Sequence, residues 1–79
     1  MFDPDYAIFT GIVAAGSISA AARELRLSPA SLSKRLARLE VRLGARLLNR
    51  TTRRMTLTME GQRLHTDLQA IQAALVAAE

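Results

Sequence analysis

The chain has 79 residues, is 49% hydrophobic and contains no cysteine, so it forms at most one small domain without disulfides or thiolate metal sites. No apolar run approaches the ~20 residues of a membrane span, and Asp3 and Asp5 stand where a signal peptide would be basic. We therefore expect a cytoplasmic protein with no membrane partner. Nine of the eleven basic residues lie within residues 26–54 beside one acid, Glu40, which gives this segment a formal charge of +8 and the rest −4. Such a localised basic surface indicates a nucleic-acid binder.

The first two predicted helices cover residues 4–15 and 18–26. Pro4 stands in the first turn of the first helix, where proline is tolerated, and Gly16 is expected to end this helix. Its apolar stripe consists of Tyr6, Phe9, Ile12 and Val13. Ser17 is a typical cap for the second helix. The expected inner face of the second helix consists of Ile18, Ala21, Ala22 and Leu25.

The third predicted helix covers residues 29–43. It begins with Ser28 as a cap and Pro29 in the first helical position, and it ends before Gly44. Leucines at spacings of 4, 3 and 4 form one stripe toward the core, at Leu32, Leu36, Leu39 and Leu43. The opposite face carries Ala30, Lys34, Ala37 and Val41, and one flank carries Ser31, Arg35, Arg38 and Arg42.

A short β-hairpin is predicted near residues 46–57, with a tip over 49–54 that is too polar to bury. Thr58 is expected to cap a fourth helix over residues 59–78. The apolar stripe of that helix is Gly61, Leu64, Leu68, Ile71 and Leu75. Because the chain ends inside a helical pattern without a cap, we expect it to be a fragment of a longer protein.

Two short helices joined by a tight turn at Arg26 and Leu27 predict a helix-turn-helix, whose second helix lies in the major groove of DNA. The first exposed turn of that helix presents small side chains that suit thymine methyl groups, and Lys34, which can donate to guanine O6 or N7. The helix N-terminus suits phosphate. Basic residues at the hairpin tip would reach the flanking backbone or the minor groove as a wing.

The stretch from Ser17 to Gly61 resembles the N-terminal DNA-binding domain of LysR-type transcriptional regulators. The matching residues include Phe9, Gly16, Ser17, Ala21, Ala22, Leu25, Ser28, Leu32, Ser33, Lys34, Leu39, Glu40, Leu43, Gly44, Leu47, Arg50, Arg53, Leu57, Thr58 and Gly61. The family often has arginine at the position of Lys34 and glutamine at that of Pro29. The resemblance implies a mainly α fold: a winged helix-turn-helix of three helices and a hairpin wing over 1–58, then a linker helix over 59–79. It also implies a bacterial, nucleoid-associated regulator, whose small-molecule effector binds only a C-terminal domain that this chain lacks.

The residue patterns and the resemblance together define a predicted DNA interface. The residues expected to contact bases are Pro29, Ala30, Ser33, Lys34 and Arg53. Those expected to contact the DNA backbone are Ser17, Ser28, Ser31, Arg35, Arg38, Arg50, Thr51 and Arg54.

The apolar stripe of the fourth helix has two possible uses: it covers the first helix, or it pairs two subunits. We favour a homodimer, with higher oligomers open to a full-length protein. The expected interface residues are Leu64, Leu68, Ile71 and Leu75.

Two alternative functions are a non-specific nucleic-acid binder and a winged-helix protein-interaction module. The few aromatic residues, all in or before the first helix, disfavour stacking on single strands, and the +8 segment disfavours a protein-only module. The serines have no accompanying base, and His65 is the only histidine, so we expect no catalysis, no cofactor and no metal site.

Overall fold

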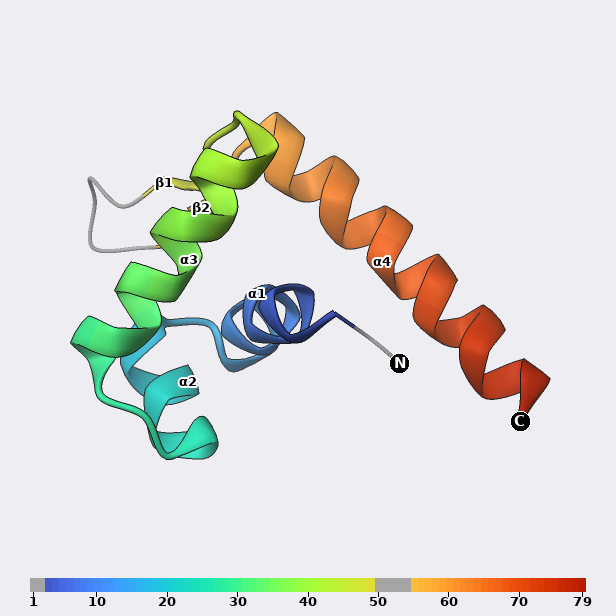
Figure 1. The fold of residues 1–79 in the computed structure, drawn as a ribbon, viewed down its shortest axis with the longest axis horizontal. Helices are drawn as coiled ribbons and strands as arrows, with labels where there is room; N and C mark the ends of the chain where they lie inside the picture. Colours follow the sequence, from blue (N-terminus) through green and yellow to red (C-terminus); the bar gives the residue numbers. More distant parts are fainter. Residues whose placement is uncertain (1–2, 50–54) are drawn as a thin grey trace.

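The computed structural model describes residues 3–49 and 55–79, and it contains four helices and a two-stranded sheet (Figure 1). The elements in chain order are α1 (Pro4–Ala15), α2 (Ile18–Leu25), α3 (Pro29–Leu43), β1 (Leu48–Asn49), β2 (Thr56–Leu57) and α4 (Met59–Ala78). The strands are antiparallel, with Leu48 opposite Leu57 and Asn49 opposite Thr56. The predicted helices and hairpin are therefore confirmed, with α2 ending one residue early. Of the predicted wing tip over 49–54, Asn49 lies in β1, and residues 50–54, including Arg50, Thr51, Arg53 and Arg54, lie outside the described residues.

Side-chain caps define where the helices begin. Ser17, Ser28 and Thr58 each accept a hydrogen bond from the backbone N–H three residues later, at 3.0, 3.1 and 3.0 Å, which satisfies one otherwise unpaired donor per helix. The turn between α2 and α3 has Arg26 in the left-handed region, with a φ of 58°. The predicted caps and the tight turn are thus confirmed.

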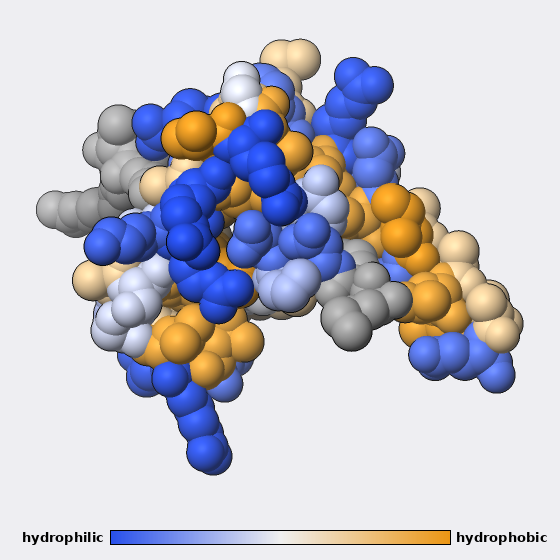
Figure 2. All heavy atoms as spheres, viewed as in Figure 1, coloured by the Kyte–Doolittle hydropathy of each residue, from blue (hydrophilic) through white to orange (hydrophobic). Residues whose placement is uncertain are grey.

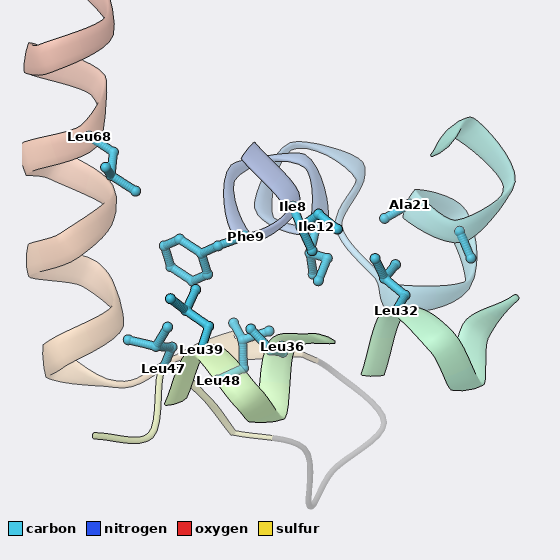
Figure 3. Packing of buried hydrophobic residues seen from close by; sticks show 11 residues of the cluster. Ile8, Phe9, Ile12, Ala21, Leu32, Leu36, Leu39, Leu47, Leu48 and Leu68 are labelled. Carbon is cyan, nitrogen blue, oxygen red and sulfur yellow. The ribbon is translucent and has the colours of Figure 1, made fainter. Parts of the chain in front are cut away.

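The core lies where α1, α2 and α3 meet, with the hairpin base and part of α4 closing one side (Figure 3). Its largest fully buried side chains are Phe9, Ile12, Leu32, Leu36, Leu39, Leu47 and Leu48. Ile8 is also buried, which the predicted stripe of α1 missed. Leu25 and Leu43 remain 41% and 39% exposed, so the prediction of both as core residues was wrong: each lies in the last turn of its helix, beyond the packed centre.

The start of α4 is fixed against the residue that precedes β1. The N–H of Thr58 donates to the carbonyl of Leu47 at 3.0 Å, and the Thr58 hydroxyl donates to the carbonyl of Arg46. Gly61 lies so close that a Cβ there would stand 2.0 Å from the Leu47 oxygen. Only glycine allows this approach of helix to backbone.

Beyond its first turns, α4 extends away from the three-helix core (Figure 1). Leu64 packs against the core and Leu68 is 2% exposed, whereas Ile71 and Leu75 are 55% and 40% exposed. Among the described residues, no helix alone has the length and hydropathy of a membrane span; α1 and α2 reach them only when taken together, across a 120° bend.

Candidate nucleic-acid interface

The outward face of α3 is an exposed surface that carries small and basic side chains. Ala30, Lys34, Ala37 and Val41 are all exposed, while three leucines on the opposite side of α3 enter the core, namely Leu32, Leu36 and Leu39. Among residues 3–49 and 55–79, no acid lies within ion-pair distance of Lys34 or Arg38. The structure therefore leaves both cations available to an anionic partner. Figure 2 shows hydrophilic side chains gathered over α3.

The N-terminus of α3 offers fewer donors than a bare helix end. Pro29 has no N–H, and the N–H of Ser31 is taken by the Ser28 hydroxyl, so Ala30 has the one N–H of this turn without an acceptor in the described part of the chain. The Ser28 hydroxyl donates to the Ser31 hydroxyl at 2.9 Å. Because Ser28 uses its hydrogen in this way, Ser31 is the better placed of the two for donating to a phosphate.

One flank of α3 is tied to the start of α1 by ion pairs. Asp5 Oδ1 lies 3.6 Å from Arg35 Nη2, and Asp5 Oδ2 lies 3.5 Å from Arg42 Nη1. Asp3 Oδ2 lies 3.6 Å from Arg42 Nη2, and the Arg42 guanidinium stands 5.3 Å from the centre of the Tyr6 ring. Arg35 is thus engaged inside the protein, and its Nε is buried without a hydrogen-bond partner in the described structure.

The other flank of α3 is tied to the hairpin by Glu40, the one acid of the basic segment. Glu40 is 6% exposed, and its Oε2 accepts from the N–H of Leu47 at 2.8 Å and of Leu48 at 3.5 Å. Arg46 Nε lies 3.5 Å from the same oxygen. The residue patterns did not identify this role; the available signal was a lone acid beside the leucine stripe, followed by a polar turn.

These contacts lower the charge that the basic segment presents. The six described cations of the segment are Arg26, Lys34, Arg35, Arg38, Arg42 and Arg46. Three of them, Arg35, Arg42 and Arg46, are paired with acids. The formal +8 therefore overstates the electrostatic attraction to phosphates, because two of the acids lie outside the segment: Asp3, the N-cap of α1, and Asp5 in its first turn.

The remaining predicted interface residues have mixed surroundings. Ser33 is half-buried, and Ser17 is half-buried with its hydroxyl accepting from Ala20. On α4, His65 packs edge-on against Phe9, with ring centres 6.3 Å apart. Leu68 already lies in the core of its own chain, so it has almost no further area to offer to a second subunit. Ile71 and Leu75 retain exposed apolar area that a second subunit could bury.

Comparisons with known proteins agree with this geometry. Residues 5–62 match the family model described as "Bacterial regulatory helix-turn-helix protein, lysR family". An HTH-type transcriptional regulator of Xanthomonas campestris pv. campestris is 47% identical over 75 residues, which cover 95% of this chain and 22% of that protein.

Two solved structures superpose on nearly the whole chain. Full-length AphB of Vibrio cholerae, a virulence activator and member of the LTTR family, has a TM-score of 0.86 and 31% identity, covering 99% of this chain and 27% of AphB. The BenM DBD, in its complex with catB site 1 DNA, has a TM-score of 0.88 and 26% identity, covering 99% of this chain and 84% of that one. This chain spans about a fifth of the length of the curated relative. It belongs to the lysR family of bacterial regulatory helix-turn-helix proteins.

Proposed function

We propose that this chain binds double-stranded DNA sequence-specifically, as the DNA-binding domain of a bacterial transcriptional regulator. The observation that carries the proposal is the exposed face of α3, with Lys34 and Arg38 unpaired among the described residues. The same fold occurs in the BenM DBD, which was solved with DNA. In this proposal α3 lies in the major groove, and the hairpin approaches the flanking minor groove or backbone.

Base contacts are assigned to the first two turns of α3. The Lys34 ammonium donates to guanine O6 or N7, and the side chains of Pro29 and Ala30 touch thymine methyl groups. Ser33 reaches a base from the half-buried side of the helix. Arg53 enters or borders the minor groove from the wing.

Phosphate contacts are assigned to residues around those proposed to contact bases. Ser31, Arg38 and the N–H of Ala30 are the best supported, because each retains a donor. Arg35 needs to leave Asp5 before it can contact a phosphate. The remaining proposed contacts come from Ser17, Ser28, Arg50, Thr51 and Arg54.

We further propose that α4 pairs two subunits through Ile71 and Leu75, with Leu64 at the edge of the interface. Exposed apolar residues continue to Val76, which is 63% exposed, and leaving such side chains in water forfeits roughly 1.5–3 kcal/mol each. A dimer would present two α3 helices to two half-sites about one helical turn apart, or a multiple of that. Residues 1–58 would then be the DNA-binding unit and 59–79 the linker, with an effector domain and any higher oligomer belonging to a longer protein in the cytoplasm.

The family consists of transcriptional regulators and is not a known enzyme family, so we infer a binding module without catalytic activity. The alternatives are non-specific nucleic-acid binding and a protein-interaction module. A duplex selected from a random pool, titrated beside a scrambled duplex of equal composition at two salt concentrations, separates the three. Tighter binding to the selected duplex at both salt concentrations supports the proposal. Equal binding to both duplexes indicates a non-specific binder, and binding to neither favours a protein partner.

A further inference from the structure

We propose that Asp5, assisted by Asp3, is a specificity-determining residue, because it neutralises two arginines of the reading helix that would otherwise attract any DNA. The inference rests on the proposed DNA binding and adds a role for acids that never need to touch a base. Specificity is the difference between affinities for the right and wrong sequence. A sequence-independent attraction to phosphates cancels in this difference unless the wrong complexes use it more than the right one does, in which case it lowers specificity.

The geometry places Asp5 between two arginines from different turns of α3. One carboxylate oxygen faces Arg35 and the other faces Arg42, at 3.6 and 3.5 Å. Asp5 is also the more buried partner, since 24% of its side chain is exposed against 36% for Arg35 and 46% for Arg42. A single carboxylate thus holds both guanidinium groups against α1.

Helix capping explains Asp3 but does not explain Asp5. Asp3 Oδ1 accepts from the N–H groups of Asp5 and Tyr6 at 2.8 and 3.4 Å, as an N-cap does. Asp5 lies in the first turn, where the helix dipole favours an acid, but a dipole alone does not direct both carboxylate oxygens at arginines. Part-exposed ion pairs contribute little to stability, so the main consequence of this cluster is a local change of charge.

The positive charge is lowered beside the part of α3 that is proposed to contact bases. Lys34, Arg38 and Arg42 follow one another at intervals of four residues, so they form one ridge along α3. Neighbours on such a ridge lie about 5–6 Å apart, which is less than the screening length of about 10 Å at 0.1 M salt. Pairing of Arg42 and Arg35 therefore lowers the positive potential next to Lys34 and Arg38.

The two binding modes use this potential differently. Non-specific binding is almost entirely electrostatic. The protein can therefore shift along the duplex until an arginine that is freed from Asp5 contacts a phosphate. In a specific complex, base contacts fix the register, so an arginine that is freed from Asp5 gains a phosphate contact only where that register places a phosphate beside it. Asp5 thus weakens the wrong complexes more than the right one.

The test compares Asp5→Asn with Asp67→Asn, which removes the same charge from an exposed position on α4. Both variants and the wild type are titrated with a selected duplex and its scrambled counterpart between about 50 and about 200 mM salt. Over this range each phosphate contact loses a factor of ~3 in affinity as the salt concentration rises. We expect Asp5→Asn to tighten binding to the scrambled duplex by roughly that factor at low salt and to steepen its salt dependence. The ratio of the two affinities should fall by about the same factor, whereas Asp67→Asn should leave it unchanged.

Two further variants connect the effect to the ion pairs. Arg35→Ala combined with Arg42→Ala should abolish the response to Asp5→Asn, because neither arginine is then present to be freed from Asp5. Asp3→Asn keeps a capping side chain and should give a smaller change in the same direction as Asp5→Asn. Thermal unfolding monitored by circular dichroism checks that each variant is folded.

The outcomes separate this inference from the proposed function. A wild type that does not distinguish the two duplexes refutes the proposed function itself. A wild type that distinguishes them, with an unchanged affinity ratio in Asp5→Asn or the same change in Asp67→Asn, overturns the role of Asp5.

Discussion

The carboxylate of Glu40 accepts a hydrogen bond from the backbone N–H of Leu47 at 2.8 Å, in a site where Glu40 is 6% and Leu47 1% exposed. This contact joins the side of α3 to the residue that precedes β1. It is therefore the link between the helix proposed to read the major groove and the hairpin proposed to act as a wing.

Replacing Glu40 should destabilise the protein by an amount that depends on whether the new side chain still offers an acceptor to the backbone N–H of Leu47. Glu40→Ala leaves a buried N–H without an acceptor and should cost about 1.5–3 kcal/mol in the free energy of unfolding. Glu40→Gln keeps a carbonyl acceptor and should cost less. Urea unfolding measures both, and Glu24→Ala on the exposed side of α2 is the control, expected within ~0.5 kcal/mol of wild type. Equal stabilities of Glu40→Ala and Glu24→Ala would contradict the proposed link.

Two glycine substitutions should change stability in opposite directions. Gly61→Ala places a Cβ 2.0 Å from the Leu47 oxygen, so α4 must move away from Leu47, at a cost of about 1–3 kcal/mol. Gly11→Ala places its Cβ 3.7 Å from Leu25 Cδ1, an ordinary contact, and removes a helix-interior glycine, which should stabilise by roughly 0.5–1 kcal/mol. Thermal melting of the two variants tests this pair, and a Gly61→Ala protein as stable as wild type would refute the close packing.

The two halves of the α4 stripe should respond differently to acidic substitutions. Leu68→Asp puts a carboxylate into the core of the chain and should prevent folding. Ile71→Asp together with Leu75→Asp alters exposed positions and should give a folded monomer with weaker binding to a palindromic duplex. Circular dichroism shows whether each variant is folded, and sedimentation shows whether it is a monomer or a dimer. A wild-type fragment that stays monomeric at high concentration and on palindromic DNA would rule out dimerisation through α4.

The sequence predicted the elements well because their signals are local. Ser28 and Pro29 start α3 and Gly44 ends it through contacts within one turn, and the leucine spacing identifies the buried face without reference to the rest of the chain. The exposed positions of Lys34 and Arg38 follow from the same periodicity.

The features that the sequence did not predict depend on which elements meet in space. The pairing of Arg35 with Asp5 spans 30 residues and depends on how α1 crosses α3, so helical periodicity contains no information about it. The burial of Glu40 likewise depends on the path of the chain after α3. Leu68 and Ile71 belong to one stripe in the sequence, but only the direction of α4 determines that the first lies in the core and the second does not.

The proposed wing contact predicts a dependence on flanking sequence. Arg53→Ala should reduce affinity most for sites with A/T-rich flanks, because a narrow minor groove concentrates negative potential. The measurement uses one selected core site embedded in A/T-rich or G/C-rich flanks. An equal loss on both would leave Arg53 only a phosphate role.

The most direct test of the central proposal, sequence-specific reading by α3, compares Lys34→Ala with Arg38→Ala. Both side chains are exposed and unpaired within the described residues, but Lys34 is assigned to a base and Arg38 to a phosphate. Lys34→Ala should weaken binding to the selected duplex by ~1–3 kcal/mol and relax the preference at one base pair. Arg38→Ala should weaken selected and scrambled duplexes about equally and flatten the salt dependence. If Lys34→Ala weakens both duplexes to the same extent and leaves every base preference intact, α3 does not read sequence through Lys34 as proposed.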